Sequence, residues 1–420
     1  MRRTLTAVSS IAVALALAAC ASASTSGSSG SSGGTITIPI LETLSGPKAD
    51  LGPLEDKGNN LAQSIINAGG GICSKRLVLD HVDDADDPVD TASATNKIVH
   101  VNGAKFILGP SSVVSGAALP ITTPAKVLTF ILGGSTAYDH NTDPYVWRTN
   151  VSDGVMAASM AQYALSRGWT RAVMVFEQQP AAISVEAPLA ADYTAHGGTM
   201  LATDNIATSQ PSYTSVINKI YSLHPQVIFT QVDPPTAAVL FKEISSLGLM
   251  HVPWVGTNTD VSSDFYSAVG AKIATSGLIY AAQSVSSTGI GATTFLSEYQ
   301  KAYNTTQIAT NANFAYDEEM VLALAMDQTC AQGKALTADN VIPNITKVTS
   351  GSGTATANYQ QAVSLIKAGK KIQWQMSGSE GGFDKYHNVF GPFNIYTFTS
   401  GGGTQSVEHF TAADLRGYAA

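Results

Sequence analysis

The chain has 420 residues, of which 44% are hydrophobic and only 13% are charged, and its formal net charge is −8. A chain of this length and composition can build two hydrophobic cores rather than one. Its basic residues are scattered rather than clustered, so it lacks the positive patch that nucleic-acid binding requires, and we exclude nucleic acid as a partner.

The N-terminus has the features of an export signal. Arg2 and Arg3 precede an apolar stretch at 11–18, which is too short to span a bilayer as a mature helix. The stretch ends in Leu17-Ala18-Ala19-Cys20, which resembles the lipobox of bacterial lipoproteins, where the cysteine is diacylated and becomes the new N-terminus. We therefore expect a lipoprotein signal peptide at 1–19 and lipidation of Cys20, with an ordinary signal peptide as the alternative.

A flexible tether is expected after this cysteine. Residues 22–34 read SASTSGSSGSSGG and contain no large apolar side chain, so they cannot offset the entropy of ordering. A linker of this length holds a domain about 20 Å from its anchor. Together with Cys20, the tether covers 20–34. We expect the folded part to lie outside the cell, held at the outer face of the cell membrane by the lipid alone.

Two cysteines remain for the folded part, Cys73 and Cys330. An even number of cysteines in an oxidising compartment favours a disulfide between them. Two unpaired buried thiols are the alternative, since sequence does not show whether the two residues are within bridging distance.

From Thr35 onward, strands and helices alternate. We expect strands at 36–41, 77–79, 106–108 and 127–130, with helices around 61–66, after Pro88 and from about Ser112. The pattern restarts after 145–147, with strands at 172–176, 200–206, 227–230 and 253–256 separated by helices. Such alternation predicts parallel sheets covered by helices. Two sets of this size predict an α/β protein with two Rossmann-like lobes.

A third stretch begins at Leu278, is mostly helical, and ends with strand-like alternation at 394–399. It is too short for a domain of its own, so we expect it to complete the two lobes. The first lobe would then contain 35–150 and 278–385, and the second 151–277 and 386–420. In this arrangement the chain crosses between the lobes three times, which makes a three-crossing hinge.

The order of several short motifs resembles the type I periplasmic binding proteins, specifically the leucine/isoleucine/valine-binding family of ABC-transporter solute receptors. The motifs are Leu44-Ser45-Gly46-Pro47, Asn67-Ala68-Gly69-Gly70-Gly71-Ile72, Asp83-Asp84-Ala85-Asp86-Asp87-Pro88, Gly109-Pro110-Ser111-Ser112, Trp147-Arg148-Thr149, Phe314-Ala315-Tyr316-Asp317 and Gly382-Phe383-Asp384. Each motif is weak alone, but together they extend over nearly the whole mature chain. The resemblance implies two lobes that close on a small solute.

In the first lobe, two loops after expected strands are candidates for binding the solute. Helix N-termini that follow parallel strands offer free N–H groups to anions, and the resemblance implies that these loops hold a carboxylate. We assign this role to Ser112, Gly134 and Ser135, with Ser111 and Thr136 as one-residue alternatives. For each serine of the first loop, a helix N-cap is an equally weighted alternative.

In the second lobe the resemblance weakens. Family members that bind amino acids place a tyrosine after the strand at 172–176, where this chain has Gln178 and Gln179, and an acidic residue near Asn258. Asp233 or Asp260 could substitute for that acid, although Asp233 also fits a solvated turn. If neither does, we expect a solute without an α-ammonium group, because an unpaired buried ammonium is costly.

Other functions are disfavoured. The acidic segment 80–90 lacks the glycine and the final glutamate of a calcium loop. The eight histidines are dispersed, so we assign no metal and no cofactor, and no catalytic motif indicates an enzyme. We expect a monomer that captures a small organic solute, amino-acid-like or another carboxylate or amide, and delivers it to the membrane subunits of an ABC permease. A membrane-tethered ligand sensor without a transport role is the alternative.

Overall fold

The computed structural model describes residues 34–46, 48–285 and 288–418. The expected signal peptide, the lipidation site Cys20 and the tether up to residue 33 lie outside the described residues. None of the helices in the described part of the chain is both long enough and apolar enough to cross a membrane.

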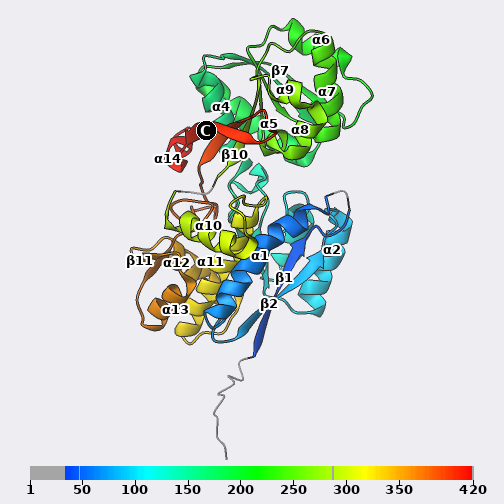
Figure 1. Cartoon of the computed structure of the whole chain (residues 1–420). Coiled ribbons are helices and arrows are strands. Elements are labelled where there is room, and N and C mark those ends of the chain that lie inside the picture. The colour runs from blue at the N-terminus through cyan, green and yellow to red at the C-terminus, as the bar shows by residue number, and fades with distance from the viewer. Residues whose placement is uncertain (1–33, 47, 286–287, 419–420) are drawn as a thin grey trace, which may run out of the picture. The chain divides into compact units, whose positions relative to one another are not determined.

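The first lobe is built on a parallel sheet (Figure 1). Strands β1 (Thr35–Glu42) and β2 (Arg76–Asp83) pair in parallel, and so do β3 (Phe106–Ile107), β4 (Leu128–Ile131) and β5 (Val146–Arg148). The Leu41 N–H donates to the Leu108 carbonyl at 2.9 Å and joins β1 to the end of β3. The strand order is therefore β2-β1-β3-β4-β5, in which β1 and β3 form the switch point where open α/β sheets bind ligands.

The helices of this part follow the expected positions closely. They are α1 (Leu51–Ala68), α2 (Pro88–Asn96), the π-helix η1 (Lys97–Val101), α3 (Ser115–Thr122) and the 3-10 helix η2 (Thr136–Tyr138). Helix α1 ends at the expected glycine turn, where Gly70 and Gly71 have φ of +103° and +73°, which L-residues adopt only with strain. Helix α3 starts three residues later than expected from the sequence, because Ser112–Val114 form a turn.

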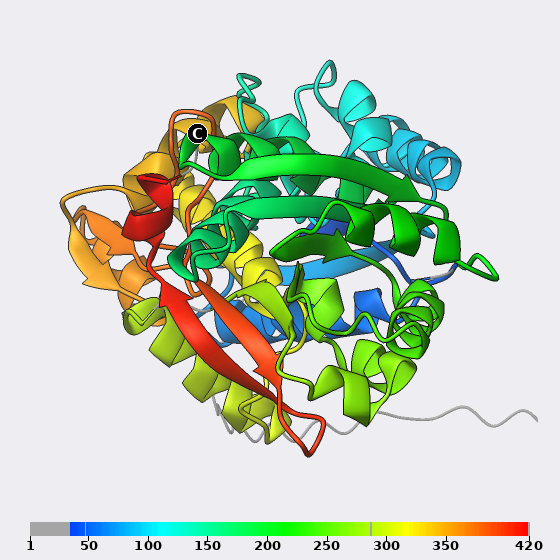
Figure 2. The same ribbon diagram turned by 90° about the horizontal axis from the view of Figure 1, so that it is seen from above.

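The second lobe repeats the same strand order. Its parallel strands are β7 (Thr199–Ile206), β6 (Arg171–Glu177), β8 (Val227–Gln231), β9 (Trp254–Gly256) and β10 (Ile279–Ser284), in that spatial order. An antiparallel hairpin of β13 (Phe393–Phe398) and β14 (Thr404–Phe410) extends the sheet at the β10 edge (Figure 2). Its helices are α4 (Asp153–Ser166), α5 (Pro180–Ala195), α6 (Thr214–Ser222), α7 (Pro234–Ser246), η3 (Asn258–Val261), α8 (Ser263–Val269), α9 (Ala271–Ala274) and α14 (Ala412–Arg416).

Strand β10 differs from the sequence-based division of the chain. The expected return to the first lobe was at residue 278, but β10 pairs in parallel with β9 and antiparallel with β13. The second sheet therefore continues to Ser284, and the chain leaves it only afterwards. The buried residues of β10 are Ile279, Ala281 and Ala282, a short apolar pattern that a strand in either lobe could show, so it does not identify the partner strand.

The segment after β10 completes the first lobe, where Figure 1 places its labelled helices beside α1. It contains α10 (Ile290–Tyr303), α11 (Ala312–Ala331), α12 (Ala338–Thr349), β11 (Thr354–Thr356), α13 (Tyr359–Lys367) and β12 (Ile372–Trp374). Helix α11 is buried along nearly its whole length, as expected of a helix that is packed on all sides. It packs against α1 so closely that a Cβ on Gly58 would lie 1.9 Å from the Ala312 carbonyl oxygen.

A disulfide joins Cys73, in the turn after α1, to Cys330, in the last turn of α11, with their Cα atoms 6.0 Å apart. This is the bridge that the cysteine count favoured. The Cys73 N–H also donates to the Asp327 carboxylate at 2.7 Å. The bridge and this hydrogen bond attach the glycine turn to the C-terminal end of α11.

Candidate functional site

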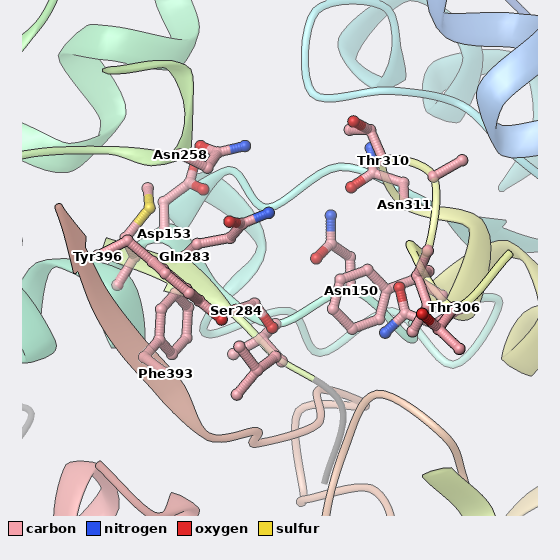
Figure 3. A pocket seen from close by; sticks show the side chains of 17 residues that line it. Asn150, Asp153, Asn258, Gln283, Ser284, Thr306, Thr310, Asn311, Phe393 and Tyr396 are labelled. Carbon is pink, nitrogen blue, oxygen red and sulfur yellow. The ribbon is translucent and has the colours of Figure 1, made fainter. Parts of the chain in front are cut away.

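A pocket of about 340 Å³ lies where segments of both lobes meet (Figure 3). This volume is within the range of small-molecule sites. Its most frequent polar side chains are carboxamides, and its apolar wall includes three aromatic rings. The lining residues are Asn150, Val151, Asp153, Met156, Asn258, Gln283, Ser284, Val285, Thr306, Ile308, Ala309, Thr310, Asn311, Asn313, Phe314, Phe393 and Tyr396.

The pocket is built from residues near the crossings between the lobes and from the loop between α10 and α11 in the first lobe. Asn150 lies between β5 and α4, Gln283 is near the end of β10, and Asn311 precedes α11. Phe393 and Tyr396 come from β13. Asn150, Gln283 and Phe393 lie near points where the chain passes from one lobe to the other, and Asn311 belongs to the first lobe. A solute in this pocket would therefore contact both lobes and the hinge.

Two asparagines have their amino groups fixed by the protein. The Asn150 Nδ2 donates to the Leu132 carbonyl at 2.7 Å, and the Asn311 Nδ2 donates to Glu55 Oε1 at 2.8 Å. Each bond uses one of the two N–H groups, so each side chain keeps its carbonyl oxygen and one N–H to offer to a solute. These two bonds fix the orientation of both carboxamides at the pocket wall.

Asp153 adds a carboxylate to the same wall. It is the first residue of α4, its N–H donates to the Gly134 carbonyl at 2.7 Å, and its Oδ2 accepts from the Ser184 hydroxyl at 2.7 Å. Burial raises the pKa of Asp153 to about 6. Among the 17 lining residues, all in the described part of the chain, no lysine, arginine or histidine occurs. The lining thus carries one acidic group and no cation.

The structure brings the two predicted first-lobe loops together. The Ser135 N–H donates to the Ser112 Oγ at 3.1 Å, and a Cβ on Gly133 would lie 2.3 Å from the Ser112 nitrogen. The loops adjoin the pocket wall through Gly134, which accepts the Asp153 N–H. They do not line the pocket themselves.

Other hydroxyls of these loops bond within the protein. The Ser111 Oγ donates to Asp86 at 3.4 Å, the Ser135 Oγ accepts from the Ala137 N–H, and the Thr136 Oγ1 donates to the Ser184 carbonyl at 3.2 Å. Ser135 therefore caps η2. Neither Ser111 nor Ser112 caps α3, because that helix begins at Ser115.

Of the predicted second-lobe residues, Asn258 lines the pocket. Gln179 instead bridges two acids, donating to Asp233 at 2.8 Å and to Glu177 at 2.9 Å. Gln178 is exposed, and its amide contacts the Asn205 carbonyl at 3.5 Å.

Asp260 does not face the pocket. It is 1% exposed and forms a capping box with Thr257, while its other oxygen accepts from the Val232 N–H at 3.3 Å. Both of its oxygens thus serve the backbone of the second lobe. Neither Asp233 nor Asp260 takes the role of the acid that the family resemblance implied near Asn258. The pocket's carboxylate is instead that of Asp153, at the start of α4.

The comparisons with known proteins agree with this architecture. A family model described as periplasmic binding protein matches residues 35–373. The chain belongs to the periplasmic binding protein family. It is 27% identical over 240 residues to the Leu/Ile/Val-binding protein homolog 3 of Brucella melitensis, which covers 56% of this chain and 64% of the relative. It is 28% identical over 217 residues to the Leu/Ile/Val-binding protein BraC3 of Rhizobium johnstonii, covering 50% and 58%. The matches thus span about 60% of these relatives' lengths.

Solved structures share the fold of periplasmic binding proteins over most of the chain. The branched-chain amino acid transporter substrate-binding protein LivJ of Streptococcus pneumoniae, in complex with isoleucine, superposes with a TM-score of 0.69 at 20% identity, covering 90% of this chain and 99% of that one. The leucine-binding protein LivK of Thermotoga maritima gives 0.71 at 16% identity, with the same coverage. A benzoate-bound solute-binding protein of R. palustris gives 0.68 at 17% identity, covering 90% and 96%. The two-lobed α/β fold expected from the sequence is confirmed.

Sequence reasoning did not identify Asn150, Gln283 and Asn311. Asn150 lies between β5 and α4, Gln283 is near the end of β10, and Asn311 is in the loop between α10 and α11. One signal was available at Asn311. It precedes the Phe314-Ala315-Tyr316-Asp317 motif, which carries part of the family resemblance. Phe314 lines the pocket, whereas Tyr316 does not.

Proposed function

We propose that this protein is the extracytoplasmic solute-binding subunit of an ABC importer, anchored to the membrane by a lipid on Cys20. The observation that carries the proposal is the pocket between the two sheets, which is lined by residues of both lobes and of the segments that connect them. A solute held there favours one relative position of the lobes, and a permease can recognise that state. Family membership supports this role over catalysis.

The solute is a small molecule that presents N–H or O–H groups to the hinge. Asn150 and Asn311 offer carbonyl oxygens there, Asp153 offers a carboxylate, and no cation lines the pocket. A carboxylate at this end would lie beside the Asp153 carboxylate with no cation in the lining to offset the repulsion, which is costly. The lining therefore favours an amide or hydroxyl group at this end. The relatives with isoleucine and benzoate bind carboxylates, so this chain would differ from them in solute class.

The first-lobe loop supplies a donor for the other end of the solute. The Ser112 Oγ accepts from the Ser135 N–H, which leaves the hydroxyl proton of Ser112 to donate. The proximity of this loop to the pocket wall, through the Gly134 contact with Asp153, supports a role in binding once the lobes close. An amide solute would then direct its N–H groups to the hinge and its carbonyl to Ser112.

Calorimetry with matched pairs tests the solute class. Benzamide against benzoate, and leucinamide against leucine, differ only in replacement of the carboxylate by an amide. We expect the amide of at least one pair to bind more tightly than its acid. Tighter binding of both acids would reject the proposed class and leave a solute-binding role intact.

Variants test the pocket. Asn258→Ala and Ser112→Ala each remove one neutral hydrogen-bonding group, so each should weaken binding by about two- to tenfold. Asn60 is exposed on α1, and Asn60→Ala is the matched control. Unchanged affinity in both Asn258→Ala and Ser112→Ala would show that the solute binds elsewhere.

A further inference from the structure

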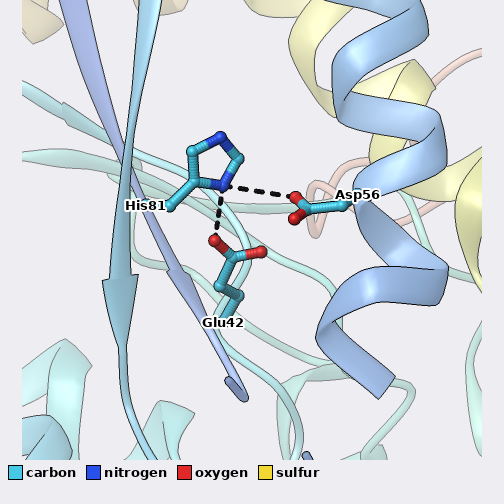
Figure 4. Close-up of side chains that lie close together, drawn as sticks. All are labelled: Glu42, Asp56 and His81. Carbon is cyan, nitrogen blue, oxygen red and sulfur yellow. Dashed lines mark hydrogen bonds and ion pairs between the residues drawn. The ribbon is translucent and has the colours of Figure 1, made fainter. Parts of the chain in front are cut away.

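A cluster of titratable side chains lies in the first lobe, apart from the solute pocket (Figure 4). Glu42 is the last residue of β1, Asp56 lies on α1 and His81 lies on β2. Both carboxylates face the same atom, the His81 Nδ1, which is 3.3 Å from Asp56 Oδ1 and closer to Glu42. The three potential ligand atoms all lie within 4.8 Å of one another.

A fourth, acidic side chain lies near this cluster, on α11. Glu319 is 1% exposed, and neither of its carboxylate oxygens has a hydrogen-bond partner. Its carboxyl lies close enough to His81 and Asp56 for their charges to act on it. Glu42 is also buried, at 3% exposed, and its Oε2 has no hydrogen-bond partner.

The charges of these four side chains do not balance. His81 supplies at most one positive charge, and its Nδ1 contacts both Asp56 and Glu42. Glu319 adds a third buried carboxyl whose oxygens have no hydrogen-bond partner. Unpaired buried carboxylates are costly, so the protein must bind either several protons or one ion of higher charge.

The donor set suits a particular class of ion. An imidazole nitrogen with two or three carboxylate oxygens is typical of sites for Zn²⁺ and related transition metals. Ca²⁺ and Mg²⁺ prefer oxygen ligands alone. We propose that Glu42, Asp56 and His81 bind a divalent transition-metal ion, with Glu319 as a further carboxylate beside it.

Such an ion would connect β1, α1, β2 and α11. The residue before Asp56 is Glu55, which accepts the hydrogen bond from Asn311 in the solute pocket. The ion would therefore fix the part of α1 that supports one wall of that pocket, and its role would be structural.

Titration calorimetry of the tag-free full-length protein with Zn²⁺, after treatment with EDTA and dialysis, tests the proposal. We expect one equivalent of Zn²⁺ to bind, with a rise in melting temperature. His81→Asn and Glu319→Gln should each weaken binding by about tenfold or more. Glu319→Gln is nearly isosteric and keeps the assay meaningful should His81→Asn fold poorly. His100 is exposed on η1, and His100→Asn is the control that should bind Zn²⁺ as the wild type does.

Three results would overturn the proposal. The first is the absence of stoichiometric binding, which would leave the cluster as an internal ion pair only. The second is Zn²⁺ affinity that stays unchanged in both His81→Asn and Glu319→Gln. The third is a loss of affinity in His100→Asn equal to that in His81→Asn, which would indicate binding to surface histidines.

Discussion

Removing the disulfide by Cys73→Ser together with Cys330→Ser should destabilise the first lobe. The two cysteines are separated by 257 residues in sequence, so the bridge closes a long loop in the unfolded chain. The chain-entropy model gives about 5 kcal/mol for a loop of this size, while measured contributions are more often 2–4 kcal/mol. The hydrogen bond from the backbone of Cys73 to Asp327 does not involve the bridge and should persist in the variant.

We expect the double variant to lose about 2–5 kcal/mol of unfolding free energy in urea titrations followed by circular dichroism. Wild-type protein unfolded under reducing conditions is the comparison, and it should match the variant. A loss below about 0.5 kcal/mol in the variant would refute the reasoning. So would two free thiols titrated in the denatured, unreduced wild-type protein.

Three further changes test the anchor, the buried acids and the core. Cys20→Ala should release the protein from the membrane fraction with its fold intact, and a variant still membrane-bound after a salt wash would contradict lipidation. Burial raises the pKa of Glu55 to about 8, whereas in the unfolded chain this carboxyl loses its proton near pH 4.5. The proton bound by the folded form therefore adds to the unfolding free energy. This contribution is fully present below pH 4.5 and is lost as the pH rises through 8. One pKa unit is worth about 1.4 kcal/mol. The melting temperature should therefore fall less between pH 5 and pH 8 in Glu55→Gln than in the wild type. Parallel falls in the two proteins would be evidence against a raised Glu55 pKa. Gly58→Ala should cost about 1–3 kcal/mol or more because its Cβ would meet the Ala312 carbonyl, whereas Gly116→Ala, with no atom within 4 Å, should be neutral or stabilising in the same urea assay.

The alternation of strands and helices was sufficient to predict the fold, because each buried strand such as β8 is a short apolar run between turn signals. It could not predict which sheet β10 joins. A half-buried strand can pair with the edge of either sheet. Its pairing with β9 and β13 depends on how the second sheet is assembled in three dimensions. The added hairpin β13–β14 was visible only as the alternation at 394–399.

Strand ends predicted that the two first-lobe loops meet, although these loops adjoin the pocket wall without lining it. Parallel strands place the loops after them at one edge of the sheet, and Ser112 and Ser135 are indeed hydrogen-bonded to each other. Asn311 could not be identified in this way, because it lies in a loop between two helices, α10 and α11, whose course is fixed by tertiary packing.

The acidic cluster was missed for a related reason. Glu42, Asp56 and His81 are far apart in the sequence and lie on three different elements. A search for closely spaced metal ligands along the chain therefore finds nothing there. Glu319 is harder still to recognise, because it lies in a long buried helix whose other residues are mostly apolar.

The central claim is that a solute binds in the pocket between the two sheets, and a thermal-shift screen of small amides, polyols and amino acids tests it most directly. We predict at least one compound that raises the melting temperature of the wild type and of Asn60→Ala in a saturable manner. The same compound should give a clearly smaller shift with Asn258→Ala and with Gln283→Ala, since both side chains line the pocket. Shifts of equal size in all four proteins, for every compound that stabilises the wild type, would contradict the claim.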